Sequence, residues 1–368
     1  MALYIVHVTD THYANDAEDI QASTTRKSQY QTSSIVQRAR RLVLSRHGCA
    51  RAELNTLWPT FIDQLGAFTN HMVVTGTEMI TVHSGDITQA GQPQSLHDAL
   101  GQIAQATSPC GLHALTGNHD VWPRDFPAFS PARTSLQARY TRSLRPLPTQ
   151  FPHHVPTSTV DIVMFDSTVP DTMLNITALG RVDAELSAAD FVLEVDQVQA
   201  PRGNFRGAVM HHPPADIATA GQSWWRSVQQ QVGFAPGMVL LDSQQLRQRL
   251  FDQHIAFVLC GHEHAPPHTS DDAIADDGRL LILQSGCPTL VRGAGNNADP
   301  QFSVFELDCF GSPTIHWYIC RLDYLRWEAF GSFEWDASTR TWSVLAQPKA
   351  VPAAFPGARL PKPPPLIP

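Results

Sequence analysis

The stretch LTGNHD, Leu115 to Asp120, places a glycine, an amide, an imidazole and a carboxylate in a row. It continues a short apolar run that starts at Leu112 and is typical of a buried strand. A polar cluster at a strand end is either a hydrogen-bonded turn or one corner of a functional site. The rest of the chain decides between these two interpretations.

Short apolar runs of this kind recur, and most of them end in Gly, Asp, Asn or His. They are ALYIVHV from residue 2, MITVHS from 79, GLHAL from 111, DIVMFD from 161, FRGAVM from 205 and IAFVLC from 255. Apolar residues at helical spacing lie between several of them, at 58–68, 96–103 and 246–250. Alternating strands and helices predict a layered α/β domain.

Five of the predicted strands are followed by residues of types that commonly bind metals. These are Asp10 and His12 in TDTH, Asp86 in SGDIT, Asn118, His119 and Asp120 in TGNHD, His211 and His212 in MHHPP, and His262 and His264 in CGHEH. Residues two apart on an extended segment project to the same side, so TDTH and CGHEH can each present two ligand atoms to one place. Carboxylate, amide and imidazole donors without thiolate suit divalent Mn, Fe, Co or Zn. A lone carboxylate such as Asp86 can bridge two ions.

The segments DxH, GD, GNHD, HH and GHxH, in this order, resemble those of the calcineurin-like metallophosphoesterase superfamily. The forms MHHPP and CGHEH are most similar to those of its class III cyclic-nucleotide and glycerophosphodiester phosphodiesterases. The resemblance covers residues 5 to about 290. It implies a four-layer α-β-β-α sandwich with a dimetal site at the C-terminal ends of the strands.

Carried over segment by segment, the resemblance implies a role for each site residue. One ion would be held by Asp10, His12 and His264, and the second by Asn118, His211 and His262, with Asp86 bridging both. His119 would face the substrate as a general acid or as a donor to the phosphoryl oxygens, and Asp120 would orient its ring. The implied mechanism is in-line attack on phosphorus by a metal-bound hydroxide.

Simpler interpretations exist for single residues. Any one predicted ligand could be an ordinary hydrogen-bonded group at a strand end. That explanation does not account for all seven residues together. His119 could be structural, and His212 could either support the site from behind or contact the substrate. Four further candidates for substrate contact follow the site segments, although tryptophan more often buries area in packing. They are Trp122, Arg124, Trp224 and Trp225.

The expected organisation is one catalytic domain over residues 1–345 with a proline-rich tail over 346–368. Insertions are expected at about 13–57, 121–158 and 213–240. The tail is either a disordered end or an extended arm against the body. The first insertion could form a cap or an oligomer contact, so a homo-oligomer is possible.

Composition narrows the class of protein. With 42% hydrophobic residues, the 368-residue chain can bury one large core or two modest ones. A net charge of -8 with scattered Lys and Arg argues against a nucleic-acid polymer as partner. No apolar run is long enough to span a bilayer, and MALYIVHVTD resembles a first strand more than a signal peptide. The six cysteines form no CxxC pair, which indicates thiols in the cytoplasm.

The leading interpretation is a cytoplasmic, dimetal-dependent phosphodiesterase that acts on a small phosphodiester, either a cyclic nucleotide or a glycerophosphodiester. Its two divalent ions are expected to be Mn, Fe or Zn, and no membrane partner is expected. The alternative is a phosphomonoesterase or a nucleotide pyrophosphatase on the same centre. A non-catalytic binding module is more remote, because none of the seven ligand positions is lost.

Overall fold

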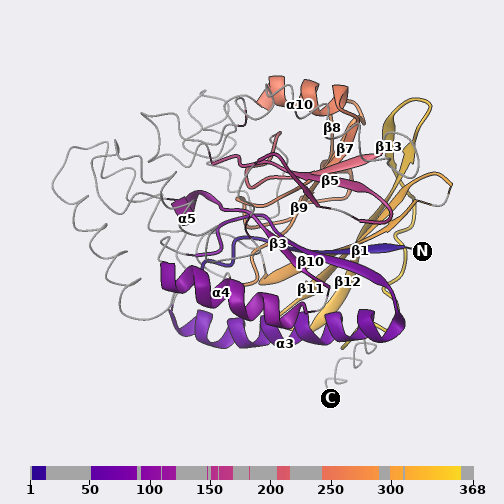
Figure 1. The fold of residues 1–368 in the computed structure, drawn as a ribbon. Coiled ribbons are helices and arrows are strands. Elements are labelled where there is room, and N and C mark those ends of the chain that lie inside the picture. The colour runs from indigo at the N-terminus through magenta and orange to yellow at the C-terminus, as the bar shows by residue number, and fades with distance from the viewer. Residues whose placement is uncertain are drawn as a thin grey trace, which may run out of the picture.

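A computed structural model describes the parts of the chain that carry the predicted strands and the residues after them. The described residues are 2–13, 51–88, 93–108, 110–121, 147, 151–155, 157–168, 182, 205–215, 243–289, 299–309 and 311–357. They form two β-sheets that lie face to face, with helices on the outer face of each (Figure 1).

The first sheet has seven strands in the order β13-β12-β11-β10-β1-β2-β3. Its strands are β1 (Leu3–Val8), β2 (Glu78–His83), β3 (Leu112–Ala114), β10 (Gln301–Asp308), β11 (Thr314–Arg321), β12 (Arg326–Asp336) and β13 (Thr341–Val344). Strands β1, β2 and β3 run parallel, whereas β10 to β13 extend the sheet antiparallel from β1. The C-terminal ends of β1, β2 and β3 therefore meet at one edge.

The second sheet has six strands in the order β4-β5-β6-β7-β9-β8. Its strands are β4 (His153–Val155), β5 (Asp161–Met164), β6 (Arg206–Val209), β7 (Ile255–Cys260), β8 (Ile274–Ala275) and β9 (Leu280–Gln284), with the short 3-10 helix η2 (Asp271–Ala273) before β8. The inner four strands are parallel, and the edge strands β4 and β8 pair antiparallel. The ends of β6 and β7 are thus also neighbours.

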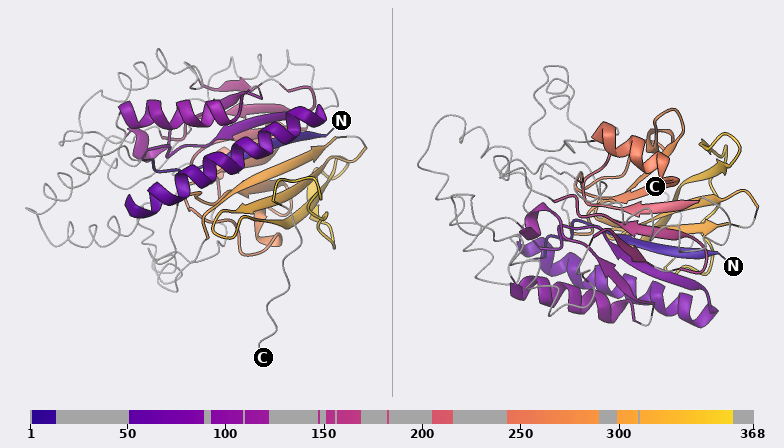
Figure 2. Two further views of the ribbon diagram at one scale, coloured as in Figure 1. Left: turned by 90° about the horizontal axis from the view of Figure 1, so that it is seen from below. Right: turned by 45° about the horizontal axis from the view of Figure 1, so that its top comes forward.

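Strand periodicity explains the layers. On β1, Leu3 and Ile5 pack into the core between the sheets, whereas Val6 and Val8 point to the other face. That outer face is covered by α3 (Arg51–Thr75) and α4 (Pro93–Ala106), which lie side by side in Figures 1 and 2. The second sheet is covered by α10 (Ser243–Asp252) on its far side. The predicted four-layer α-β-β-α sandwich is confirmed.

All six strands predicted from apolar runs are present, as β1, β2, β3, β5, β6 and β7. Two described elements lie inside the predicted insertions, whose bounds stay a prediction. Helix α3 begins at Arg51, inside the first predicted insertion, and runs through Pro59, because a proline costs a helix only local bonds that packing can offset. Strand β4 lies inside the second predicted insertion and pairs with β5. Most of the remaining inserted sequence lies outside the described residues.

The described part of the proline-rich tail, residues 346–357, lies against the body. The Phe355 side chain is buried and makes edge contacts with Phe68 of α3 and Trp327 of β12, both at 4.9 Å between ring centroids. Trp327 Nε1 donates a hydrogen bond to the carbonyl of Pro356 at 2.8 Å. Of the two alternatives for the tail, an arm against the body fits these residues.

Among the described residues, no helix combines the length and the apolar composition needed to cross a membrane. The five cysteines in the described part are free thiols, and they are Cys110, Cys260, Cys287, Cys309 and Cys320. The cytoplasmic location and the domain boundaries stay predictions.

Candidate metal centre

The two sheets bring the five predicted segments to one place. Asp10 and His12 follow β1, Asp86 follows β2, and Asn118 begins the one-turn helix α5 (Asn118–Val121) after β3. The histidines of MHHPP and CGHEH follow β6 and β7 of the other sheet. A hydrogen bond from the His262 amide to Asp10 Oδ2, 2.9 Å long, joins the two sheet edges.

The donor atoms form two adjacent groups. We call Asp10, His12, Asp86 and His264 the first ligand group, and Asn118, His211 and His262 the second ligand group. In the first, one donor atom of each residue lies within 4.8 Å of the others. His211 and His262 meet the same criterion together with His212, a residue assigned only low weight from sequence. Six of the seven predicted ligands thus gather here, and the seventh, Asn118, joins them because its Oδ1 lies 2.9 Å from His211 Nε2.

Left-handed backbone marks these segments. The residues with positive φ at the site are Asp10 (53°), His12 (44°), Asp86 (52°), His262 (73°) and His264 (61°). This conformation is uncommon for residues with a Cβ, and such outliers gather at functional sites, where the surrounding structure enforces them. Five of the seven predicted ligands are therefore held in strained loops that the fold imposes.

The two carboxylate oxygens of Asp10 have different surroundings: one is hydrogen-bonded to the protein and the other faces the ligand groups. Oδ2 accepts hydrogen bonds from Thr9 Oγ1 at 2.8 Å and from the amide of His262. Oδ1 is buried, accepts no hydrogen bond within the described residues, and lies 3.4 Å from His264 Nε2. A buried carboxylate oxygen without a donor is costly unless a cation fills the place of one.

Asp86 is shared between the two groups. Its Oδ1 accepts the amide hydrogen of His119 at 2.7 Å. Its Oδ2 lies 4.0 Å from His12 Nε2 of the first group and 3.4 Å from His211 Nε2 of the second. One oxygen thus faces both groups, which is the placement expected of a bridging ligand.

The distances between donor atoms fit metal ions. His211 Nε2 lies 2.9 Å from Asn118 Oδ1 and 3.1 Å from His262 Nδ1. In the first group, His12 Nε2 lies 2.9 Å from His264 Nε2. Two donors that bind one ion at right angles, each at about 2.1 Å, are separated by about 3.0 Å. The residues present therefore suit two divalent ions, and the set of oxygen and imidazole donors suits Mn, Fe or Zn.

The electrostatics of the site are consistent with this role. Burial holds the pKa of His12 and of His262 well below the usual range, so both rings are neutral. Burial works to raise the pKa of Asp86, but His211 and His119 outweigh it and hold that pKa well below the usual range. For His211, burial lowers the pKa, but Asp86 outweighs it and raises the value to about 9.

His119 lies beside Asp86 and the first ligand group. Its Nε2 lies 3.9 Å from Asp86 Oδ2, and its ring meets that of His12 edge to face at 4.6 Å. The side chain is 11% exposed, against 0% for His12 and His211. Asn118 and His264, at 6% and 5% exposed, are nearly as accessible as His119 at 9%, so its position beside the shared carboxylate supports a substrate contact more than its exposure does.

Asp120 has a different role from the predicted one. Its Oδ1 accepts hydrogen bonds from the amide and the hydroxyl of Thr88, and its Oδ2 from the amides of Ile87 and Gly117, all between 2.8 and 3.0 Å. Four donors fill the acceptor sites of a carboxylate. The carboxylate therefore ties the loop after β2 to the loop before α5, and the prediction that it orients the His119 ring needs correction.

Two residues that sequence reasoning missed support the histidines. The carbonyl of Ser84 accepts a hydrogen bond from His211 Nδ1 at 3.0 Å. The hydroxyl of Ser167 lies 2.9 Å from His212 Nδ1. The polar triplet Asp166 to Thr168 after a predicted strand was the signal available for Ser167. The candidates Trp122, Arg124, Trp224 and Trp225 lie outside the described residues.

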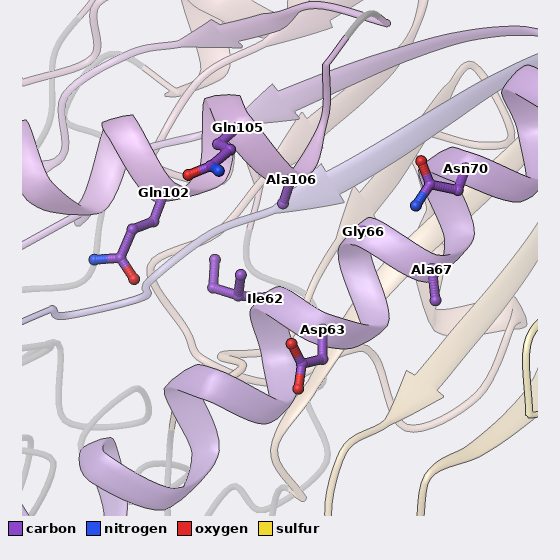
Figure 3. Close-up of a pocket in the computed structure, with 8 residues that line it drawn as sticks. All are labelled: Ile62, Asp63, Gly66, Ala67, Asn70, Gln102, Gln105 and Ala106. Atoms are coloured by element: carbon purple, nitrogen blue, oxygen red, sulfur yellow. The ribbon is translucent and has the colours of Figure 1, made fainter.

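A separate hollow of about 530 Å³ lies between α3 and α4 (Figure 3). Its walls are mostly small or amide side chains, such as Gly66, Asn70 and Gln102. No residue of either ligand group lines it, so it is distinct from the metal centre.

A two-sheet sandwich with this donor set at its strand ends defines a metallohydrolase with a candidate dinuclear centre. The model of the calcineurin-like phosphoesterase family matches residues 3–266, and the chain belongs to that family. A sequence comparison with curated proteins finds no match.

Three solved structures illustrate the likeness in fold. Purple acid phosphatase PPD1 from yellow lupin (Lupinus luteus) seeds aligns at a TM-score of 0.49 and 12% identity, over 91% of this chain and 53% of that one. GAP50, the anchor in the inner membrane complex of Plasmodium, gives 0.45 and 10%, over 90% and 88%. The phosphopantetheinyl hydrolase PptH of Mycobacterium tuberculosis gives 0.35 and 12%, over 78% and 90%. This chain thus spans about half the length of the lupin enzyme, and these likenesses concern the fold alone.

Proposed function

We propose that the chain is a dimetal-dependent phosphodiesterase that hydrolyses a small phosphodiester, such as a cyclic nucleotide or a glycerophosphodiester. The observation that supports a hydrolase is the position of Asp86. One of its two carboxylate oxygens, Oδ2, lies within 4.0 Å of a donor atom from His12 of the first ligand group and from His211 of the second. The preference for a diester rests on the forms MHHPP and CGHEH of the histidine segments.

In this proposal the chain holds the ions and positions the ester. The first ligand group would hold one ion, the second ligand group the other, and Asp86 both. When bound, the two ions would lower the pKa of water and neutralise charge on the phosphoryl oxygens. The His119 ring, whose Nε2 lies 3.9 Å from Asp86 Oδ2, would donate a proton or a hydrogen bond to the ester oxygens.

A direct test compares bis-p-nitrophenyl phosphate with p-nitrophenyl phosphate on protein loaded with Mn²⁺, Fe²⁺ or Zn²⁺. We expect the diester to turn over faster, and cyclic nucleotides and glycerophosphodiesters to be cleaved in a follow-up screen. Faster turnover of the monoester would favour a phosphomonoesterase, and cleavage restricted to dinucleotide pyrophosphates would favour a pyrophosphatase.

A non-catalytic binding module is the competing class. It predicts that protein with two bound ions turns over no phosphoester, and that Asp86→Asn and His119→Ala variants keep full partner binding. The proposal predicts instead that both variants lose turnover.

A further inference from the structure

Three segments meet at the edge of the sandwich that lies opposite to the metal centre. They are the last turn of α10, which contains Phe251, the turn between β8 and β9 at 276–279, and the turn between β12 and β13 at 337–340. The amide of Trp342 donates a hydrogen bond to the carbonyl of Gly278 at 2.6 Å and joins the two turns. Strands β7 and β9 run parallel and begin at this edge, and the six residues of β7 separate it from the metal centre by roughly 17 Å.

Two arginines from the two turns lie over one aromatic ring at this edge. The guanidinium carbon of Arg340 is 3.9 Å from the centre of the Phe251 ring, and that of Arg279 is 5.0 Å from it. Because both distances end at the same point, the two carbons are no more than about 9 Å apart. Arg340 Nη2 also donates a hydrogen bond to the carbonyl of Phe251, which fixes the direction of its other N–H groups. A single oxyanion between the two guanidinium groups can reach both, since such charge-assisted bonds are about 2.7–2.9 Å long.

Neither of these two guanidinium groups has a carboxylate partner in the part of the chain that the structure describes. Three acidic residues lie in the same segments. Asp276 pairs with Arg247 at 2.8 Å, and Asp252 accepts a hydrogen bond from a glutamine of its own helix at 2.9 Å. Asp277 is exposed and pairs with neither guanidinium. Two neighbouring positive charges that no carboxylate neutralises favour the binding of an anion.

The backbone of Arg340 adds a second observation. Its φ is 55°, in the left-handed region that glycine and asparagine adopt most readily. The pairing of Asp336 with Thr341 closes the turn around it and enforces this conformation. An arginine here costs more backbone energy than a glycine would, and such strain is typical of functional positions. The side chain, and not the turn, therefore accounts for the arginine at this position.

We propose that Arg279 and Arg340, held over the Phe251 ring, form a second anion site that binds the phosphate group of a small molecule. The planar forks of two guanidinium groups suit a tetrahedral oxyanion, which accepts several N–H bonds at once. Two positive charges also match the charge of a phosphate group, about -1.5 to -2 at neutral pH. The inference goes beyond the proposed function, because this site uses no residue of either ligand group.

The test follows the Nε–Hε signals of the arginines by NMR while orthophosphate is added to the Zn²⁺-loaded full chain. We expect saturable shifts at Arg279 and Arg340. In Arg279→Gln, the response of Arg340 should require at least about tenfold more orthophosphate, the loss typical of a hydrogen bond to a charged group, and the reverse should hold for Arg340→Gln. Because the signals belong to these side chains, orthophosphate bound at the metal centre does not contribute to them.

Two further variants test the arrangement. Phe251→Leu keeps an apolar side chain but removes the ring, and should weaken the response of both arginines. Arg326→Gln is the matched control, since it removes a 60% exposed guanidinium from the start of β12 and should leave that response unchanged.

The outcomes that would overturn the proposal are distinct from failure of the proposed function. Shifts at Arg279 and Arg340 no larger than those at Arg326 would refute the site, as would an unchanged affinity in both glutamine variants. Binding to vesicles that contain an anionic phospholipid, without any response to orthophosphate, would refute a small molecule as the ligand. None of these results concerns phosphoester turnover, which tests the proposed function separately.

Discussion

Asp86 is the residue on which the two halves of the centre depend. Its Oδ2 faces donors from both ligand groups, and its Oδ1 holds the amide of His119. Since Asp86 belongs to the first ligand group and also faces His211 of the second, its substitution should affect both ions, whereas loss of a residue that faces only one group should affect one ion.

We predict that Asp86→Asn lowers the affinity for both ions together, because an amide oxygen carries no net charge and the amide nitrogen cannot bind a cation. Elemental analysis after dialysis measures the metal content. Asp63→Asn, the same change at an exposed position of α3, is the control and should keep both ions. Two ions retained by Asp86→Asn would contradict the bridge.

His119 separates metal binding from chemistry, because it is adjacent to a ligand without belonging to either group. We predict that His119→Ala retains both ions and that kcat falls by about 10²- to 10⁴-fold, the usual contribution of a positioned proton donor. His97→Ala removes a 63% exposed imidazole from α4 and should change neither quantity. A loss of less than about tenfold would leave His119 with a structural role.

At the scale of elements, the loops after β1 and β7 approach each other so closely that no side chain fits at Gly261. A Cβ on Gly261, directly after β7, would lie 1.8 Å from Thr9 Oγ1 and 2.4 Å from Asp10 Oδ2, at the end of β1. This glycine lets the edges of the two sheets meet, and the hydrogen bond from the His262 amide to Asp10 depends on that approach.

We therefore predict that Gly261→Ala lowers the free energy of unfolding by about 1–3 kcal/mol, the usual cost of overpacking, and weakens metal binding. Gly101 of α4 is the matched control, since a Cβ there meets nothing within 4 Å. Gly101→Ala should be neutral or stabilising by up to about 1 kcal/mol, because alanine favours a helix. Chemical denaturation measures the free energy of unfolding of both variants. Equal values for Gly261→Ala and Gly101→Ala would refute the close approach of the two loops.

Strands β1 and β2 each bury a neutral histidine behind the centre. Burial lowers the pKa of His7 and of His83 to about 3. His7 Nε2 lies 2.9 Å from Ser84 Oγ, and His83 Nδ1 accepts the amide of Gly85 at 3.2 Å. Both rings thus support the loop after β2 in their uncharged form.

Because the folded pKa lies below the value of about 6.5 expected when unfolded, protonation of these histidines favours unfolding. Their contribution to stability is complete above pH 6.5 and is lost as the pH falls toward 3, by about 1.4 kcal/mol per pH unit for each ring. Denaturation of metal-free protein at several pH values measures this slope. His7→Gln should lower the slope of unfolding free energy against pH by the contribution of one proton, about 1.4 kcal/mol per pH unit. An unchanged slope would show that His7 is not a buried neutral histidine.

At the scale of the whole molecule, the C-terminal arm ties the outer helix layer to the seven-stranded sheet. Phe355 packs against Phe68 of α3, Trp327 of β12 and Tyr318 of β11, and no residue of either ligand group is among its ring contacts. The arm should therefore contribute to stability without contributing to the metal centre.

We predict that Phe355→Ala lowers the free energy of unfolding by about 3–5 kcal/mol, as for other buried phenylalanines, and leaves the metal content unchanged. Val74→Ala, at a side chain that is 85% exposed, should change stability by less than about 0.5 kcal/mol. A Phe355→Ala protein as stable as Val74→Ala would show that the arm is not part of the fold in solution.

Local patterns in the sequence determined six strands, three helices and the residues that meet at their ends. They could do so because buried parallel strands have continuous apolar runs, and because ligand chemistry is a property of residue type. The antiparallel strands β10 to β13 were not assigned from sequence, although β10 is almost entirely buried, since their pairing depends on distant partners.

Tertiary structure alone decided how these residues work. The left-handed backbone of Asp10 and His264 arises in loops at the ends of the two sheets; Asp and His tolerate this conformation better than most residues, but only the surrounding structure enforces it. The reassignment of Asp120 depends on hydrogen bonds to Ile87 and Thr88, more than thirty residues away. Likewise, the resemblance assigns the ligand role to His211 and not to His212, but it does not fix the tautomer of either ring. Only the partners that the fold places beside each ring determine which nitrogen carries the hydrogen.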